Sequence, residues 1–365
     1  MRVRPPTIWS VSAAALAVVA LAGCREQPKG LPISAAPAPP GTQPTAAFAK
    51  ARKPAGDIKL TILTNGDSPF WEPMRKGMEE MAAELGCKAV RQSPPNAEHN
   101  AQVRIVGDAL AGGADGIAVS PVQADAFAPT IDKAIAEGVP VITFDSDSET
   151  SKRLVYIGTN NYEAGKRAGE AAIKLFPSGG RLVAFVGNMT AQNARDRYRG
   201  FMDAVKGHGI EMLQAPFEDD KDRARAQRNV ADAITRYGDR INGFLGLYSY
   251  NGPAIVTEVM KAGVRAKVKV LCFDGEPQTL MALRAGQVDY TVVQKPYQFG
   301  RLSTKLLYLI NRKGLDEALK ELSTEANSLG MRVNGNIIDT GVEVVTPKSA
   351  AEFIRKLRER GLEST

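Results

Sequence analysis

Short apolar runs alternate with amphipathic segments along the chain from Leu60 to Arg312. Several runs are continuously apolar, as strands buried on both faces of a sheet are, and the segments between them carry apolar residues at helical spacing. This order of strand and helix predicts an α/β protein with parallel sheets and right-handed crossovers. Strands are predicted at 60–66, 87–93, 114–122, 138–147, 153–161, 181–188, 214–217, 241–249, 267–275 and 288–297, and helices at 74–85, 102–110, 129–137, 162–176, 194–206, 222–237, 254–261, 277–284 and 299–312.

Two of these strands share one design and lie in different halves of the chain. Residues 138–147, GVPVITFDSD, form an apolar strand that ends at Asp145, and residues 267–275, KVKVLCFDG, form another that ends at Asp274. Ligands of open α/β sheets bind beyond the carboxyl ends of the strands. The repeat therefore predicts two similar lobes whose strand ends face a shared cleft.

Polar side chains that can form hydrogen bonds follow most of the predicted strands. Sugar hydroxyls need both donors and acceptors, and the apolar face of a sugar ring needs an aromatic plane, so such a set is typical of a carbohydrate site. The same residue types also serve in turns and as helix N-caps, which is the competing interpretation for any one of them. The set comprises Asn65, Phe70, Trp71, Ser120, Asp145, Asn160, Asn161, Asn188, Asn193, Tyr250, Asn251, Asp274 and Gln294.

The first residues have the pattern of a targeting segment. Arg2 and Arg4 precede an apolar run over 11–22, which is too short for a stable membrane anchor. The run leads into LAGC, which resembles the lipobox of bacterial lipoproteins and predicts that Cys24 is lipidated; the alternative is an ordinary signal peptide with a chance cysteine. Residues 25–56 are rich in Pro and Ala and cannot build a core, so they predict an extended tether.

Composition excludes several other kinds of protein. Cys87 and Cys272 lie in different predicted lobes, which favours two buried thiols over a disulfide. The two histidines, His99 and His208, are far apart and lack the spacing of metal ligands. The net charge of +7 comes from basic residues interleaved with acidic ones, unlike a nucleic-acid-binding stripe, and neither glycine-rich nucleotide motif occurs. We therefore expect no metal, no cofactor and no nucleic-acid partner.

Seven motifs in the folded region carry a family resemblance. They follow one another in the family's order, and on them the chain resembles the periplasmic sugar-binding proteins of ABC importers, in the ribose-binding group. The resemblance implies a type I periplasmic binding protein, in which two doubly wound parallel-sheet lobes are joined by a three-segment hinge and close on a monosaccharide. The motifs are SPFW at 68–71, VPVITFDSD at 139–147, GTNNYEAG at 158–165, QNARDRYRGF at 192–201, SYNGPA at 249–254, VLCFDG at 270–275 and VVQKPYQFG at 292–300.

The resemblance also assigns roles to individual residues. It places Phe70 and Trp71 on the faces of the sugar, and Asn193 and Arg195 among the donors at the start of a helix in the second lobe. One departure concerns Ser146, which stands where ribose binders carry an arginine, so ribose itself does not carry over as the ligand. The match is within one residue at two places, where either Asn160 or Asn161 and either Tyr250 or Asn251 could be the contact. The ligand-binding residues implied are Ser68, Phe70, Trp71, Asp145, Asn161, Asn193, Arg195, Tyr250, Asn251, Asp274 and Gln294.

The same resemblance sets the expected boundaries of the chain's parts. The chain would cross between the lobes near 158–159, near 295–296, and between 325 and 336, where the pattern is weakest. The parts are a signal peptide at 1–23, a lipidated tether at 24–56, an N-terminal lobe at 57–159 plus 295–328, and a C-terminal lobe at 160–294 plus 329–365.

Together these features predict a monomeric substrate-binding lipoprotein of the cell envelope that passes a monosaccharide to an ABC permease and its ATPase. Only the lipid would attach it to a membrane. A sugar-sensing subunit for a membrane receptor is the closest alternative. A transcriptional regulator would need an N-terminal helix-turn-helix, where this chain has the lipobox and the tether. A glycosidase using Asp145 and Asp274 as a carboxylate pair is less favoured, because both are better explained as acceptors for sugar hydroxyls. We therefore expect a binding protein and no enzyme.

Overall fold

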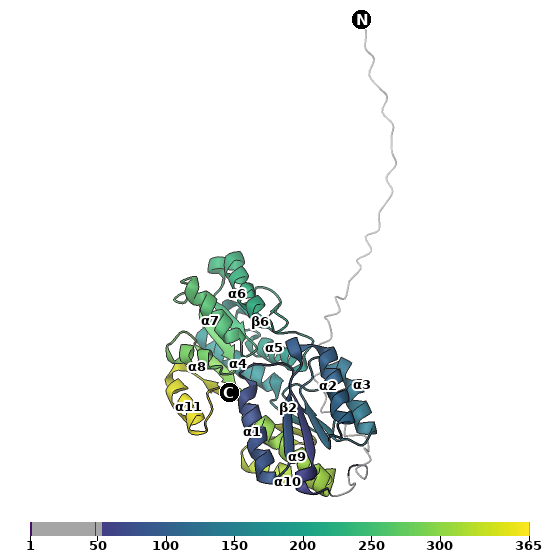
Figure 1. Ribbon diagram of the computed structural model, residues 1–365. Coiled ribbons are helices and arrows are strands. Elements are labelled where there is room, and N and C mark those ends of the chain that lie inside the picture. Colours follow the sequence, from purple (N-terminus) through teal and green to yellow (C-terminus); the bar gives the residue numbers. More distant parts are fainter. Residues whose placement is uncertain (2–47, 49–52, 365) are drawn as a thin grey trace, which may run out of the picture. The chain divides into compact units, whose positions relative to one another are not determined.

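The structure, a computed structural model, describes Met1, Phe48 and residues 53–364, and Phe48 and residues 53–364 belong to one compact unit (Figure 1). Outside the described residues lie the predicted signal peptide except Met1, as well as Cys24 and all of the predicted tether except Phe48 and residues 53–56. Across the described part, no helix is both long enough and apolar enough to span a bilayer.

The N-lobe is built on a seven-stranded sheet in the order β12-β13-β5-β4-β3-β1-β2. Its strands are parallel except for β12, which pairs antiparallel with β13 at one edge. The strands are β1 (Lys59–Leu63), β2 (Lys88–Gln92), β3 (Gly116–Val119), β4 (Val141–Phe144), β5 (Tyr156–Gly158), β12 (Arg332–Asn334) and β13 (Ile337–Asp339), and the helices are η2 (Ala55–Asp57), α1 (Trp71–Leu85), η3 (Pro95–Ala97), α2 (His99–Ala111), α3 (Ala124–Ala136), α9 (Pro296–Lys313) and α10 (Leu315–Ser328).

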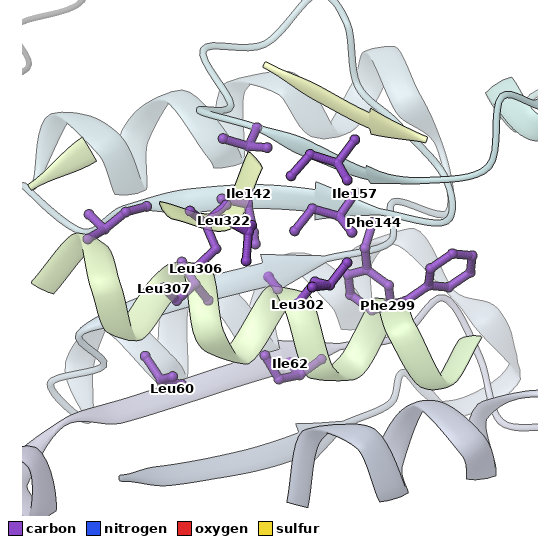
Figure 2. Packing of buried hydrophobic residues seen from close by; sticks show 14 of the residues in the cluster. Leu60, Ile62, Ile142, Phe144, Ile157, Phe299, Leu302, Leu306, Leu307 and Leu322 are labelled. Carbon is purple, nitrogen blue, oxygen red and sulfur yellow. The ribbon is translucent and has the colours of Figure 1, made fainter. Parts of the chain in front are cut away.

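Helix α9 lies far along the sequence but packs against α1 and the first strands, as its green colour among purple and blue elements shows (Figure 1). Its apolar face, which includes Leu302 and Leu306, covers the sheet beside Ile62 and Ile142 (Figure 2). The two helices approach closely at Gly77, where a Cβ atom would lie 2.1 Å from the Tyr297 carbonyl oxygen. This packing fixes α1, whose first turn carries Trp71.

The C-lobe repeats the design with a second seven-stranded sheet in the order β14-β11-β10-β9-β6-β7, with β8 also paired to β6. Only β14 runs antiparallel to its neighbour. The strands are β6 (Gly180–Val186), β7 (Ile210–Met212), β8 (Phe217–Glu218), β9 (Gly243–Gly246), β10 (Lys269–Phe273), β11 (Tyr290–Val293) and β14 (Glu343–Val345), and the helices are α4 (Asn161–Leu175), α5 (Gln192–Val205), α6 (Arg223–Tyr237), η4 (Gly238–Arg240), α7 (Asn251–Lys261), α8 (Pro277–Arg284) and α11 (Pro347–Glu359).

The predicted α/β class with two doubly wound lobes is confirmed, with two differences in detail. The sheets are not wholly parallel, because each ends in one antiparallel edge strand. The third crossing lies between β13 and β14, at 340–342, instead of between 325 and 336. Residues 332–339 form a hairpin that turns at Gly335 and adds to the N-lobe sheet with Ile338 buried, so residues 329–339 extend the N-lobe. Such short strands carry too few residues for a periodicity to show.

Candidate functional site

The carboxyl ends of both sheets meet at an interlobe cavity of about 420 Å³. Loops that follow β1, β2 and β4 line it from the N-lobe, and residues from α5 and from the loops after β8, β9 and β10 line it from the C-lobe. The predicted site residues that line this cavity are Ser68, Phe70, Trp71, Asp145, Asn193, Tyr250, Asp274 and Gln294.

Asp145 and Asp274 occupy matching places in the two lobes. Each follows the last residue of an inner strand, with φ of 60° and 61°, and their exposed fractions are only 3% and 2%. The left-handed region is uncommon for residues other than glycine, but Asp enters it more readily than most. In that conformation both carboxyl groups line the cavity.

The two carboxyl groups are held by different neighbours. Asp145 accepts a hydrogen bond from Ser120 Oγ at 2.9 Å and a longer one from Asn65 Nδ2 at 3.4 Å, whereas Asp274 accepts from Gln294 Nε2 at 3.1 Å. Burial raises the pKa of Asp145 above its ordinary value and that of Asp274 to about 6, while the nearby Arg197 opposes both shifts.

Two arginines, Arg197 and Arg223, line the cavity, whereas the predicted Arg195 does not. Arg197 on α5 is 1% exposed; its Nε donates to Asn161 Oδ1 at 2.8 Å and its Nη1 to the Leu247 carbonyl at 2.9 Å. Its buried Nη2 has no hydrogen-bond partner, so a donor remains for a ligand. Its guanidinium also lies 4.9 Å from the centre of the Phe273 ring.

Arg195 does not line the cavity and serves the start of its own helix. It donates to the Thr190 carbonyl at 2.6 Å and to Gln192 Oε1 at 2.5 Å. Two residues along an α-helix turn the side chain by about 200°, so Arg195 and Arg197 lie on nearly opposite faces of α5. The sequence held a usable signal, because Arg197 follows Asn193 by four residues and so shares the face that reaches the cavity.

Asn161 and Asn251 stand behind the cavity wall instead of lining it. Asn161 accepts the Arg197 Nε bond and donates to the Thr159 carbonyl at 3.1 Å, which ties the arginine to the first crossing. Asn251 accepts from the Tyr248 backbone N–H at 2.9 Å and donates to Asp219 at 3.0 Å. Both residues therefore position the groups in front of them.

Tyrosines complete the C-lobe side of the cavity. The Tyr248 hydroxyl donates to Asn193 Oδ1 at 2.9 Å, and the Tyr250 hydroxyl donates to Asp219 at 2.5 Å. Sequence reasoning identified Tyr250 but missed Tyr248, which also lines the cavity. The bond from Tyr248 leaves the amide nitrogen of Asn193 free to donate elsewhere.

The aromatic side of the cavity comes from the N-lobe. The rings of Phe70 and Trp71 meet edge to face with centroids 4.8 Å apart, and Trp71 also contacts Phe144 at 5.7 Å. Trp71 is 3% exposed and belongs to the N-lobe core while it lines the cavity. It therefore serves both stability and the site.

The cavity thus offers carboxylate acceptors, an unpartnered guanidinium donor and an aromatic wall. Gln294 adds an amide whose buried Oε1 has no hydrogen-bond partner. Hydroxyl groups donate and accept at once, so this set fits a polyhydroxylated ring with one apolar face. Among the described residues, no group of His, Cys, Asp or Glu could hold a metal ion.

Comparison with protein families gives one match. The family described as "Periplasmic binding protein domain" covers residues 58–315, which include β1 to β5 of the N-lobe, β6 to β11 of the C-lobe and helix α9 of the N-lobe.

Individual relatives point the same way. The ribose import binding protein of Salmonella typhimurium is 26% identical over 256 residues, covering 70% of this chain and 84% of the relative. The D-allose-binding periplasmic protein of Escherichia coli is 27% identical over 279 residues, covering 74% and 88%. Among solved structures, a solute-binding protein of an ABC transporter from Burkholderia graminis, in complex with D-arabinose, is 28% identical with a TM-score of 0.71, covering 81% and 98%. A glucose-galactose binding protein from Geobacillus stearothermophilus is 27% identical with a TM-score of 0.69, covering 80% and 98%.

Proposed function

This chain belongs to the periplasmic binding protein family, in the group of type I sugar-binding proteins that resemble ribose-binding proteins, and from this premise we propose that it binds one monosaccharide for an ABC importer. The observation that carries the proposal is the unpartnered Arg197 Nη2, which lies in a cavity with two buried carboxyl groups and an aromatic wall. A buried donor without a partner is costly, and a ligand hydroxyl would satisfy it.

The ligand would be held by both lobes. Phe70 and Trp71 would cover the apolar face of the ring, while Asp145, Asp274 and Gln294 would accept from its hydroxyls. Because these groups come from both lobes, the ligand would stabilise the closed state through contacts that the open state lacks. No covalent step is needed for this role, so we propose a binding protein and not a glycosidase.

The ligand is expected among neutral monosaccharides, and the proteins named above are described as binding ribose, allose, arabinose, glucose or galactose. Ser146 stands where ribose binders carry an arginine, which makes ribose a weaker candidate. Isothermal titration of the protein with a panel of these sugars tests the function. We expect saturable binding of one of them at one site per chain; no binding across the panel would overturn the proposal.

We further propose that residues 1–23 are a signal peptide and that a lipid on Cys24 ties a monomer to the cell envelope, with 24–56 as the tether. This rests on the LAGC motif. The soluble part would then deliver sugar to a membrane permease with its ATPase, and a role in sensing would use the same site with a receptor in place of the permease. Stable attachment requires more than one acyl chain, as a lipoprotein provides.

Partitioning into detergent tests the anchor. Wild type should enter the detergent phase, and Cys24→Ser should remain in the aqueous phase. Equal partitioning of the two forms would contradict lipidation at Cys24.

A further inference from the structure

Left-handed residues other than glycine cluster at the cleft. In the described part of the chain they are Asp145, Asp274 and two adjacent pairs, Asn96–Ala97 in the N-lobe and Asp220–Lys221 in the C-lobe, with φ between 52° and 66°. All of them line the interlobe cavity or the groove beside it. Such conformations cost energy and persist where the surroundings fix them, which is frequent at functional sites. The two pairs therefore need an explanation beyond that of the aspartates.

Lys221 crosses the cleft. Its ammonium donates to the Asn65 carbonyl of the N-lobe at 2.8 Å, while its backbone N–H donates to Asp219 Oδ1 at 2.9 Å and so fixes the turn. Gly66 lies between the two strained pairs and is close to both. A Cβ atom on Gly66 would lie 3.5 Å from Ala97 Cβ and 3.9 Å from Lys221 Cδ. The two turns thus meet at one place between the lobes.

The two strained turns lie between the interlobe cavity and a neighbouring groove. Asn96, Ala97 and Lys221 line the inner cavity of about 420 Å³ and also an outer groove of about 470 Å³. The outer groove is polar, with His99, Asn188 and other amide and hydroxyl side chains along it. The Lys221 side chain therefore lies at the boundary between the predicted sugar cavity and a second, hydrophilic space.

The position of the Lys221 side chain is energetically unfavourable for its charge. No carboxylate among the described residues forms an ion pair with it, although Asp145 and Asp219 lie near enough to attract its charge. Burial lowers the pKa of Lys221 to about 8. A strained, partly buried cation at this position has no evident role in the core of either lobe, which leaves its bond across the cleft as its contribution.

We propose that Lys221 determines the size of the ligand by closing the sugar cavity against the outer groove. The inference rests on the proposed function. With the Lys221–Asn65 bond formed, the cavity admits a single sugar ring. Without the side chain the two spaces join, and the outer groove can take a second sugar unit on its amide and hydroxyl groups.

The first test needs no ligand. In a chain with Trp9→Phe, Trp71 is the only indole, and its emission can be quenched by acrylamide that reaches the cavity. Lys221→Gly removes the side chain and tolerates the left-handed backbone, so we expect the quenching constant to rise about twofold. Lys221→Met keeps the bulk without the bond and should give a smaller rise, and Lys267→Ala, a change at an exposed lysine of the same lobe, should give none. An unchanged constant in Lys221→Gly would overturn the closure.

The second test measures ligand size by calorimetry. Each variant is titrated with D-xylose and xylobiose, with D-glucose and cellobiose, and with L-arabinose and arabinobiose. Lys221→Gly should shift the ratio of disaccharide to monosaccharide affinity about tenfold towards the disaccharide. The variant loses both the hydrogen bond to Asn65 and the side chain that stands between the cavity and the outer groove. Weaker monosaccharide binding at an unchanged ratio would overturn the proposal and make Lys221 a ligand contact. If wild type binds no sugar of this panel or of the monosaccharide panel above, the proposed function fails, and the quenching measurement alone decides the closure.

Discussion

Each lobe places an aspartate at the end of an inner strand beside the cleft, but the residues around the two aspartates differ. In the N-lobe, Asp145 is held by the neutral groups of Ser120 and Asn65, beside the aromatic pair that begins α1. In the C-lobe, Asp274 is held by Gln294, which directly precedes the second crossing, and the cations of the cavity come from this side. The N-lobe therefore supplies the aromatic face and one carboxyl group, whereas the C-lobe supplies the other carboxyl group, the cations and the link to the hinge.

The largest effect is expected from removing Arg197, the buried arginine of the C-lobe. Arg197→Ala would leave Asp145 and Asp274 without the cation that opposes their burial, and removing one partner of a buried charge cluster costs about 3–5 kcal/mol. We expect sugar binding to fall below detection by calorimetry and the thermal midpoint to drop. Arg195→Ala on the same helix is the matched control, because Arg195 bonds only to its own helix start. Equal losses in both variants would contradict the assignment of Arg197 to the site.

A second comparison sets the two aspartates against each other. Asp145→Asn and Asp274→Asn keep a residue that tolerates the left-handed backbone but lose the charged acceptor. Each should lower sugar affinity by about 2–4 kcal/mol, measured by calorimetry. An aspartate whose loss lowers the thermal midpoint but leaves affinity intact would be a turn residue and not a ligand contact.

The aspartates should also affect the stability of the unliganded protein. In an open, hydrated cleft their replacement by Ala would be nearly neutral. Both are buried and accept hydrogen bonds from neighbouring side chains, so Asp145→Ala should also lower the free energy of unfolding, by about 1–3 kcal/mol, as Ser120 and Asn65 lose their acceptor. Chemical denaturation without ligand measures this loss.

The aromatic side of the N-lobe should have a smaller effect on affinity. Trp71→Ala removes buried apolar area against the ring and should cost about 1–3 kcal/mol of binding, with loss of any fluorescence response to sugar. Because Trp71 also packs on Phe144, this variant should be less stable, so Trp71→Phe is the better probe. Trp71→Phe should keep most of the affinity while losing the emission. Unchanged affinity in Trp71→Ala would place the indole outside the site.

The sequence predicted most of this arrangement for a physical reason. Buried parallel strands are continuous apolar runs, and Asp145 and Asp274 follow two such runs directly, so their position at a common cleft could be predicted without a structure. The faces of helices were harder to predict. Arg195 and Arg197 differ only in which side of α5 they occupy, and Asn161 and Asn251, each the first residue of a helix, lie behind the residues that line the cavity. Lys221 could not be found, because its role depends on a strained turn and on a contact with the opposite lobe.

The smallest expected effect is a dependence on pH that separates the two lobes. Burial raises the pKa of Asp274 to about 6, so the folded, unliganded protein holds this proton more tightly than the unfolded chain does. The protonated carboxyl therefore contributes stability that is complete below about 4 and is lost as the pH rises through about 6. Sugar binding has the opposite sign, because an ionised Asp274 is the stronger acceptor for hydroxyl groups.

Calorimetry between pH 7.5 and pH 5 tests this sign. Affinity should fall about tenfold over that interval, since Asp274 becomes mostly protonated. Asp219 also has its pKa raised to about 6 by burial, but it lies behind Tyr250 and Asn251, so Asp219→Asn should keep most of the dependence while Asp274→Asn should flatten it. A flat profile in wild type would mean that the ligand does not use the Asp274 carboxylate, and the C-lobe would then hold the ligand through its other groups, Arg197 among them.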